Sequence, residues 1–272
     1  MLVHCRGLAG ATTAVAARVT RHSDTVDVAG IAFQLSCRFP KPSFWACRRP
    51  ELVTRHRPDV VVRIDYVEGY RGRAGRQVGD TVADAADVRR RGRGLLVSTG
   101  YYRAAVDTRG GRIAVRMAAG FEVGGLMRTL AALWLLERQT LLIRAACLGP
   151  AASATLACGL ADGAPQPAIS GWLAVSARPD GVFVRPTPFV DGDSPLGAAV
   201  RRATTLSLPG ALPEPRPVGA AMALGALLPS IWQADRRRPA VEHTLDLATR
   251  VVTTLRCEMG STSLVRNEAA VG

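Results

Sequence analysis

The segment Ser153–Gln166 (SATLACGLADGAPQ) has the layout of a phosphate-binding loop without the side chains that do its chemistry. A working loop follows a buried strand, reads G-x-x-x-x-G-K-[S/T] and opens a helix, so that backbone N–H groups, the lysine and the hydroxyl hold phosphate and Mg²⁺. Here the apolar run Ser153–Cys158 predicts the strand, and Gly159 stands at the first glycine. The later positions of the motif hold, in order, the turn residue Gly163, then Ala164, Pro165 and Gln166. Taken alone, the segment is much better explained as an ordinary strand and turn, because one glycine after an apolar run is common.

The other residue types that catalysis needs are sparse and scattered. Lys41 is the only lysine and lies between two prolines, far from the loop in sequence. Phosphoryl transfer depends on a cation clamp, Mg²⁺ and a positioned base. The nearest carboxylates downstream, Asp191 and Asp193, fit a solvated loop better than a metal site. The four histidines and six cysteines have no zinc spacing, and no Ser-His-Asp or Cys-His arrangement is visible. We therefore expect no catalytic residues, no metal and no cofactor.

The composition indicates a globular and strongly basic chain. Of the 272 residues, 48% are hydrophobic, which is enough for a sizeable core. The net charge of +13 is carried almost wholly by arginine and favours an acidic partner, whether a peptide, an anionic surface or nucleic acid. Nucleic acid is the weakest of these readings because no recognition motif accompanies the charge. No apolar run is long enough to span a membrane, and the cysteines fit buried thiols of a reducing compartment. We expect a soluble, cytoplasmic protein.

Hydrophobic periodicity predicts strands in the first half of the chain and mixed elements in the second. The predicted strands are Thr25–Leu35 (one or two around Gly30), Asp59–Tyr66, Leu95–Val97, Tyr101–Asp107, Arg112–Met117, Thr140–Cys147, Ser153–Cys158, Ile169–Val175 and Gly181–Val184. The predicted helices are Gly124–Arg138, a short one within Pro195–Thr204, Val218–Leu228 and Pro239–Arg256. Arg89–Arg93 is predicted as a basic turn and Pro209–Pro217 as a linker. The chain then divides into a tail (1–22), a β-rich unit (23–120), a second unit (121–262) and a tail (263–272).

The order of these segments resembles the HPr kinase-like family, whose core is related to phosphoenolpyruvate carboxykinase. The similarity covers roughly Asp24 to Cys257 and rests on the sequence of stretches rather than on any one of them. The best-matching stretches are Pro58–Val67, Arg103–Met117, Leu126–Ala146, Ser153–Gly159, Ile169–Pro188 and Leu227–Gln233. The resemblance implies an α/β (α+β) fold with a β-rich amino-terminal part and a mixed-sheet kinase core. It also implies an origin among protein or peptide kinases.

Carried over residue by residue, the family's catalytic set is absent. Members usually have a histidine at the end of the strand before the hairpin that leads into the loop strand, where this chain has Arg144. Members also have a helix after the loop and then an acidic pair, whereas Gly171 and Trp172 stand at the pair's positions. Only Pro167–Ile169 separate the loop from Ser170, so the helix that would hold an anion is predicted to be missing.

These observations predict a catalytically degenerate family member, a pseudokinase, that binds a protein or peptide in a pathway such as peptide modification. The alternative is a divergent enzyme that retains nucleotide- or phosphate-dependent activity through its arginines. Candidate partner-binding residues are two arginine-dense segments, Arg89, Arg90 and Arg91 together with Arg236, Arg237 and Arg238. Should the partner surface be apolar instead, Phe44 and Trp45 are the next candidates. The sequence does not determine the oligomeric state.

Overall fold

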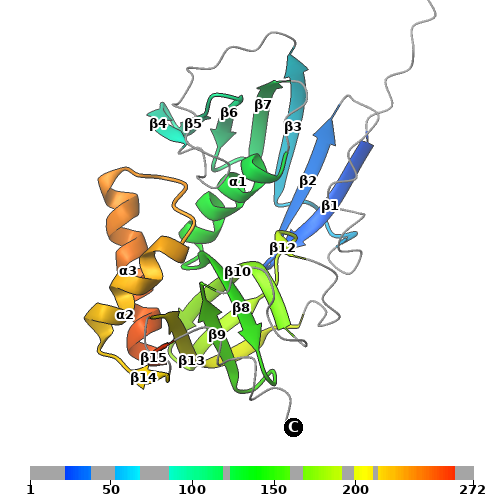
Figure 1. Cartoon of the computed structure of the whole chain (residues 1–272). Coiled ribbons are helices and arrows are strands. Elements are labelled where there is room, and N and C mark those ends of the chain that lie inside the picture. The colour runs from blue at the N-terminus through cyan, green and yellow to red at the C-terminus, as the bar shows by residue number, and fades with distance from the viewer. Residues whose placement is uncertain are drawn as a thin grey trace, which may run out of the picture.

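The computed structural model describes residues 22–37, 53–67, 86–118, 123–159, 168–191, 199–210 and 214–260. Within these ranges the chain forms two mixed β-sheets and three α-helices, which confirms the expected α+β class in its general form. Figure 1 shows the first sheet (sheet A) above the second (sheet B), with helix α1 running between them. The predicted tail 263–272 and residues 1–21 of the other tail lie outside the described ranges, as do Lys41, Phe44 and Trp45.

Sheet A follows the strand order β1-β2-β3-β7-β6-β5-β4. Its strands are β1 (His22–Val28), β2 (Ile31–Cys37), β3 (Val60–Val67), β4 (Asp87–Arg91), β5 (Gly94–Ser98), β6 (Tyr102–Asp107) and β7 (Arg112–Ala118). Buried and exposed residues alternate along β6 and most of β3 and β7, as expected for a sheet with one face on a core and one in solvent. The alternation that predicts these strands therefore also sorts their side chains between two faces.

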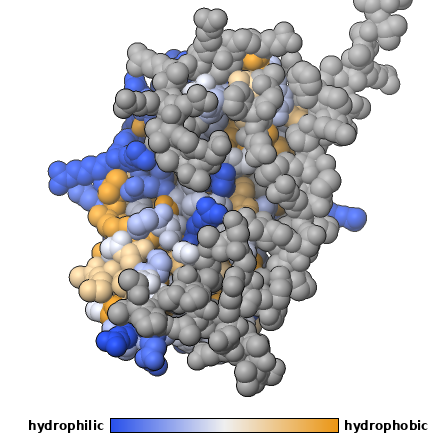
Figure 2. All heavy atoms as spheres, in the orientation of Figure 1, coloured by the Kyte–Doolittle hydropathy of each residue, from blue (hydrophilic) through white to orange (hydrophobic). Residues whose placement is uncertain are grey.

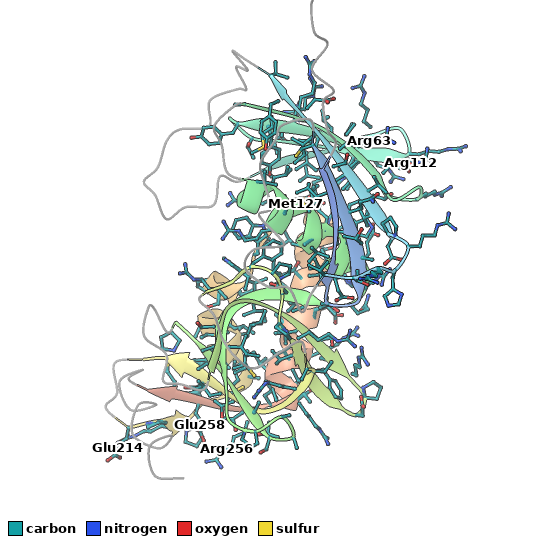
Figure 3. All side chains as sticks on the ribbon, turned by 90° about the vertical axis from the view of Figure 1, so that its right-hand side faces the viewer. Arg63, Arg112, Met127, Glu214, Arg256 and Glu258 are labelled. Carbon is teal, nitrogen blue, oxygen red and sulfur yellow. The ribbon has the colours of Figure 1, made fainter. Side chains whose placement is uncertain are left out.

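Helix α1 (Val123–Glu137) covers the buried face of sheet A. Met127 and Leu130 are fully buried in the same cluster as the inward side chains of the sheet. Trp134 meets Phe33 of β2 edge-on, with ring centroids 6.2 Å apart. In Figure 3 Met127 lies on one side of sheet A, while Arg63 and Arg112 extend from the other. The sequence assigns this helix to the second unit, whereas its buried side chains pack mainly into the core of the first.

Sheet B follows the order β11-β10-β8-β9-β13-β15-β14, with β12 added beside β10. Its strands are β8 (Leu141–Leu148), β9 (Ala154–Cys158), β10 (Ala168–Arg178), β11 (Gly181–Arg185), β12 (Val190–Asp191), β13 (Arg201–Pro209), β14 (Arg216–Pro217) and β15 (Arg256–Gly260). Strands β9, β13 and β15 run parallel to one another. An additional pairing of β11 with β13 closes five strands into a ring. A second hydrophobic core joins these strands to the carboxy-terminal helices.

The two carboxy-terminal helices are α2 (Ala220–Leu227) and α3 (Arg238–Thr254), close to their predicted bounds. The buried stripe of α3 follows the 3.6-residue period, with Leu247, Val251 and Val252 in the second core. No helix in the described part of the chain is long and apolar enough to cross a membrane.

Three predictions about local structure are wrong within the described residues. The short helix expected to end at Thr204 is not formed there, because residues from Arg201 onward belong to the nine-residue strand β13. The basic turn begins as a strand, since Arg89, Arg90 and Arg91 are the last residues of β4. The predicted linker ends in strand β14, and strand β15, which follows α3, was not predicted. Strands β13, β14 and β15 form by pairing with strands distant in sequence, whereas β4 forms by a tight hairpin with β5.

Candidate functional site

The positions singled out by the family resemblance lie in one row across three neighbouring strands. Trp172 of β10 is opposite Arg144 of β8, and Gly171 is opposite Ala145. Ala145 is in turn opposite Cys158 of β9, and Gly159 follows Cys158 directly. The fold thus brings Gly159, Arg144 and Trp172 together although they are far apart in sequence. Gly163, Pro165 and Gln166 lie outside the described residues.

Trp172 is packed into an aromatic cluster rather than exposed to a ligand. Its ring meets that of Trp232 at 87°, with centroids 5.0 Å apart. The guanidinium of Arg128, on α1, lies over both rings, at 4.9 Å from the centroid of Trp232 and 5.8 Å from that of Trp172. Edge-on aromatic pairs and arginine over an indole are both attractive arrangements. The cluster therefore links α1 to sheet B at the place where the resemblance implies an acidic pair.

Backbone hydrogen bonds hold this cluster in place. The N–H of Trp232 donates to the carbonyl of Leu142 at 2.8 Å, which fixes the segment after α2 against β8. The carbonyl of Trp172 accepts a short hydrogen bond from the hydroxyl of Thr187, and its N–H donates to the carbonyl of Phe189. The packing and the hydrogen bonds both explain a structural role for Trp172.

The row offers no means of holding a metal ion. In the described ranges no three His, Cys, Asp or Glu side chains gather as a metal site would require. Asp191 is the nearest acidic residue in the pairing scheme, on β12 opposite Ser170, while Asp193 lies outside the described residues. Arg144 is the exposed cation of the row, and an arginine alone could neutralise an anion but could not position Mg²⁺ or act as a base.

The thiols beside the row are not nucleophiles at neutral pH. Burial raises the pKa of Cys158, the last residue of β9, to about 12. Burial likewise raises the pKa of Cys147 on β8 to about 11 despite the opposing influence of Arg201. Because the thiolate is the reactive form, both cysteines are protonated and inert under ordinary conditions. They serve as small apolar residues of the second core, as the sequence predicts.

The arginine segment before α3 is largely occupied by partners within the chain. Arg237 makes a two-pronged ion pair with Asp235, whose side chain is only 4% exposed. Arg238 pairs with Glu242 one turn along α3, at 2.7 Å. Arg236 is exposed and makes no ion pair with any described residue. Figure 2 shows hydrophilic atoms projecting near the start of α3, but two of the three candidate arginines there are already neutralised.

Replacing Arg237 by glutamine should lower the free energy of unfolding by about 2 kcal/mol, because it leaves the buried Asp235 carboxylate without its charged donor. The matched control is Arg238→Gln, which removes only an exposed i,i+4 pair and should cost about 0.3–0.5 kcal/mol. Urea denaturation of both variants measures the difference. Equal costs would show that the Arg237–Asp235 pair does not hold the segment before α3.

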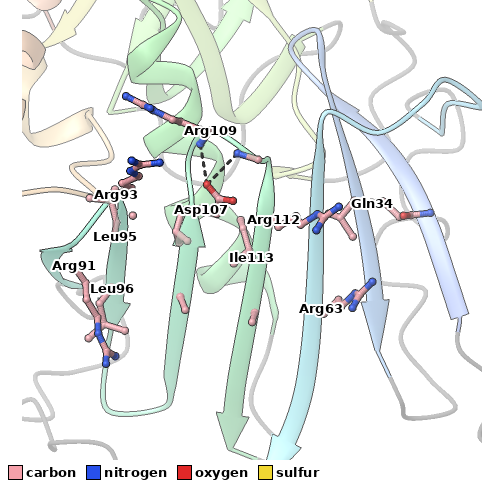
Figure 4. A pocket seen from close by; sticks show the side chains of 16 residues that line it. Gln34, Arg63, Arg91, Arg93, Leu95, Leu96, Asp107, Arg109, Arg112 and Ile113 are labelled. Atoms are coloured by element: carbon pink, nitrogen blue, oxygen red, sulfur yellow. Dashed lines mark hydrogen bonds between the residues drawn. The ribbon is translucent and has the colours of Figure 1, made fainter.

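A second arginine cluster lies in a groove on the solvent face of sheet A, with a volume of about 960 Å³ (Figure 4). We call it the arginine groove; it is lined by the outward side chains of β3 to β7, with Gln34 at its β2 end. Its charged members are Arg63, Arg91, Arg93, Asp107, Arg109 and Arg112, and its small or apolar members include Val61, Leu96, Ala105 and Ala114. The groove therefore combines a small-residue floor with cationic edges.

The carboxylates near the arginine groove are engaged by neighbours. Asp107 accepts the backbone N–H groups of Arg109 and Gly110 through Oδ1, so it closes its own turn. Asp87 pairs with Arg89 at 2.7 Å. Among the residues that the structure describes, Arg63, Arg91 and Arg112 form no ion pair. The groove consequently carries a net positive charge over an open surface, with five arginines against the one carboxylate of Asp107 among its lining residues.

Of the groove's arginines, the sequence pointed to Arg91 and Arg93, as members of a run of neighbours. Arg63 and Arg112 are isolated in sequence, and only the pairing of β3 with β7 brings them to one surface. A usable signal was present, because arginine stands at outward positions of strands with otherwise alternating apolar residues. Arg89 and Arg90 belong to the same edge strand, β4, and Arg89 is neutralised by Asp87.

Comparison with known proteins identifies no relative. No protein-family model matches the chain, and no curated protein matches it.

Proposed function

We propose that this chain is a non-catalytic, HPr kinase-like scaffold that acts by binding an acidic protein or peptide. The observation that carries the proposal is the arginine groove, an open surface with arginines along its edges. The carboxylates of Asp87 and Asp107 already bind neighbours within the chain, Asp87 by an ion pair with Arg89 and Asp107 by hydrogen bonds within its turn. A charged surface of one sign attracts oppositely charged partners and sets their orientation.

The state of the row Gly159, Arg144 and Trp172 supports a binding role over an enzymatic one. A kinase would need acidic side chains at Gly171 and Trp172, and Trp172 instead packs against Trp232 and Arg128. Positions that serve chemistry in the family are here filled by packing between α1 and sheet B. A pathway that modifies a peptide would supply an acidic polypeptide partner of this kind.

Titration with ATP and Mg²⁺ distinguishes the scaffold from a divergent enzyme. We expect no saturable, Mg²⁺-dependent heat or thermal shift at millimolar nucleotide, because holding the nucleotide with Mg²⁺ needs the loop lysine, the loop hydroxyl and a metal-binding carboxylate pair. The control is Arg144→Gln, which should be equally silent. A saturable, Mg²⁺-dependent signal that Arg144→Gln abolishes would overturn the scaffold reading in favour of an enzyme that uses this arginine.

A further inference from the structure

The arginine groove has a floor and two banks, which follow from the pairing register of sheet A. Ala114 of β7 is opposite Ala105 of β6, and Ala105 is opposite Leu96 of β5. These three side chains make a continuous small-residue floor that runs across the strands. Arg63 lies opposite Ala114 on β3, and Arg89 lies opposite Leu96 on β4, so an arginine stands at each end of the floor.

Arginines also stand on both sides of this floor. On one side Arg112 of β7 begins a bank that continues through the groove residues Arg109, Arg93 and Arg91. On the other side, just beyond the lining residues, Arg116 of β7 lies opposite Arg103 of β6, and these two form the second bank. This row ends in a carboxylate on each side, because Asp65 of β3 is opposite Arg116 and Asp87 of β4 is opposite Ser98, the neighbour of Arg103. All of these arginine side chains point to solvent, because they occupy exposed positions of strands or turns.

The dimensions of the floor match an α-helix. Arg112 and Arg116 are four residues apart on one strand, so their Cα atoms are separated by about 14 Å. A helix with its side chains is about 10–12 Å across and would lie between the banks. Four strand spacings separate β3 from β4, about 19 Å, which corresponds to about 13 helical residues.

The chemistry of the floor and banks specifies what that helix must present. Alanine and leucine at the floor allow the close approach of an apolar stripe. The first bank has four arginines around Asp107, and the second has Arg103 and Arg116 at its centre, so the arginines of both banks attract acidic flanks. Single-stranded nucleic acid is disfavoured because none of the described residues lining the groove is aromatic, so bases have no side chain on which to stack.

We propose that the arginine groove binds an acidic amphipathic helix of the partner, laid across strands β3 to β4 with its apolar stripe on Leu96, Ala105 and Ala114. This inference rests on the proposed binding function and names the form of its partner. Charge complementarity selects acidic flanks, and the width between Arg112 and Arg116 selects a helix over an extended strand.

The experiment measures binding of fluorescent probes to the full chain by anisotropy. One probe is a synthetic peptide of about four helical turns, with alanine and leucine along one face and glutamate along both flanks. The second probe has the same composition in scrambled order, and the third is an oligothymidylate. We expect the amphipathic peptide to bind about tenfold more tightly than the scrambled one, since only the first can use the floor and both banks.

Two pairs of variants separate shape from charge. Arg63→Gln with Arg112→Gln should weaken binding of the amphipathic peptide about tenfold. The charge-matched control, Arg202→Gln with Arg216→Gln on exposed positions of sheet B, should leave it unchanged. Ala105→Arg with Ala114→Arg adds positive charge but fills the floor. It should weaken the amphipathic peptide and strengthen the oligothymidylate.

Several outcomes would overturn the inference. Three results would each show an electrostatic surface without a helix site. The first is equal affinity for the scrambled and amphipathic peptides, and the second is tighter binding of the amphipathic peptide by the variant Ala105→Arg with Ala114→Arg. The third is tighter binding of the oligothymidylate than of the amphipathic peptide. The ATP titration decides the proposed function independently. A silent titration combined with either of the first two outcomes would leave the acidic-partner scaffold standing and remove only the helix, whereas preference for the oligothymidylate would also remove the acidic polypeptide partner.

Discussion

Replacing Trp172 by alanine should lower the free energy of unfolding by about 3 kcal/mol, the lower end of the range for removing a large aromatic side chain, because Trp172 is half-buried. The loss comes from three contacts at once: the edge-on ring of Trp232, the guanidinium of Arg128, and the anchorage of α1 on sheet B. Urea denaturation followed by circular dichroism measures it. Met222→Ala is the control, because Met222 is a large apolar side chain that is exposed on α2 and should cost under about 0.5 kcal/mol.

A double-mutant cycle tests whether the two tryptophans act as a pair. Trp232→Ala should cost a similar amount to Trp172→Ala, and the double variant should cost about 1 kcal/mol less than the sum of the two. Strict additivity would mean that the rings contribute independently and that the cluster is not what joins α1 to sheet B. Under the proposed function, both variants should bind the partner as tightly as the wild type at temperatures where they stay folded. The reason is that the arginine groove lies on the face of sheet A that points away from α1 and the two tryptophans.

Replacing Gly111 by alanine should cost about 3 kcal/mol of stability. Gly111 lies in the turn between β6 and β7 with φ of +61°, a conformation that is strained for a residue with a side chain. A Cβ there would also come within 2.1 Å of the carbonyl oxygen of Asp59, just before β3. The Asp59 carbonyl cannot move freely, because β3 is tied to the same turn: the N–H of Val61 donates to the carbonyl oxygen of Gly111 at 2.7 Å. The turn is thus fitted closely against the neighbouring strand.

Gly92→Ala is the matched control for this prediction. Gly92 has almost the same φ, +59°, but a Cβ there would meet nothing within 4 Å. It should therefore cost only about 1 kcal/mol, the contribution of the left-handed backbone alone. Chemical denaturation of the two variants separates backbone strain from steric overlap, which adds about 1–3 kcal/mol at Gly111. Similar costs at both positions would show that the β6–β7 turn can shift away from β3.

The row of Gly159, Arg144 and Trp172 and the arginine groove belong to different parts of the molecule. The row Gly159, Arg144 and Trp172 lies on sheet B, near α1, whereas the groove lies on the face of sheet A that points away from α1. Under the proposed function, binding at the groove is therefore independent of how Trp172 packs in the row.

Local periodicity was enough to predict the elements whose side chains alternate strongly or follow a helical stripe. The strand at Asp59–Tyr66 is β3, the strand at Arg112–Met117 is β7, and the helix at Gly124–Arg138 is α1, each within about two residues. These segments form one-sided apolar surfaces that are recognisable without knowledge of their neighbours. The class of fold follows from them, because strands and helices of this kind must cover one another.

Long-range pairing decided everything that the sequence left open. The segment Arg201–Pro209 carries Thr204, Thr205 and Ser207 and has no strong alternation, yet it becomes β13 because β9, β11 and β15 all pair with it. The partner of α1 was also decided at this level, since an apolar helix face does not specify which sheet it covers. In the same way, the sequence identified Arg144, Gly159 and Trp172 separately, and only the registers of β8 with β9 and β10 place them in one row.

The arginine groove shows most clearly why a sequence alone does not reveal which residues share a surface. The sequence determined that arginine carries the charge of this chain and that a basic segment precedes β5. The sequence pattern favoured runs of adjacent arginines as the binding surface. The groove also contains single arginines, at outward positions of strands that are distant in sequence. Side chains alternate along a strand with period two, so neighbours on a surface come from neighbouring strands and not from neighbouring residues. Which strands are neighbours is a property of the sheet order, and that order exists only in the folded chain.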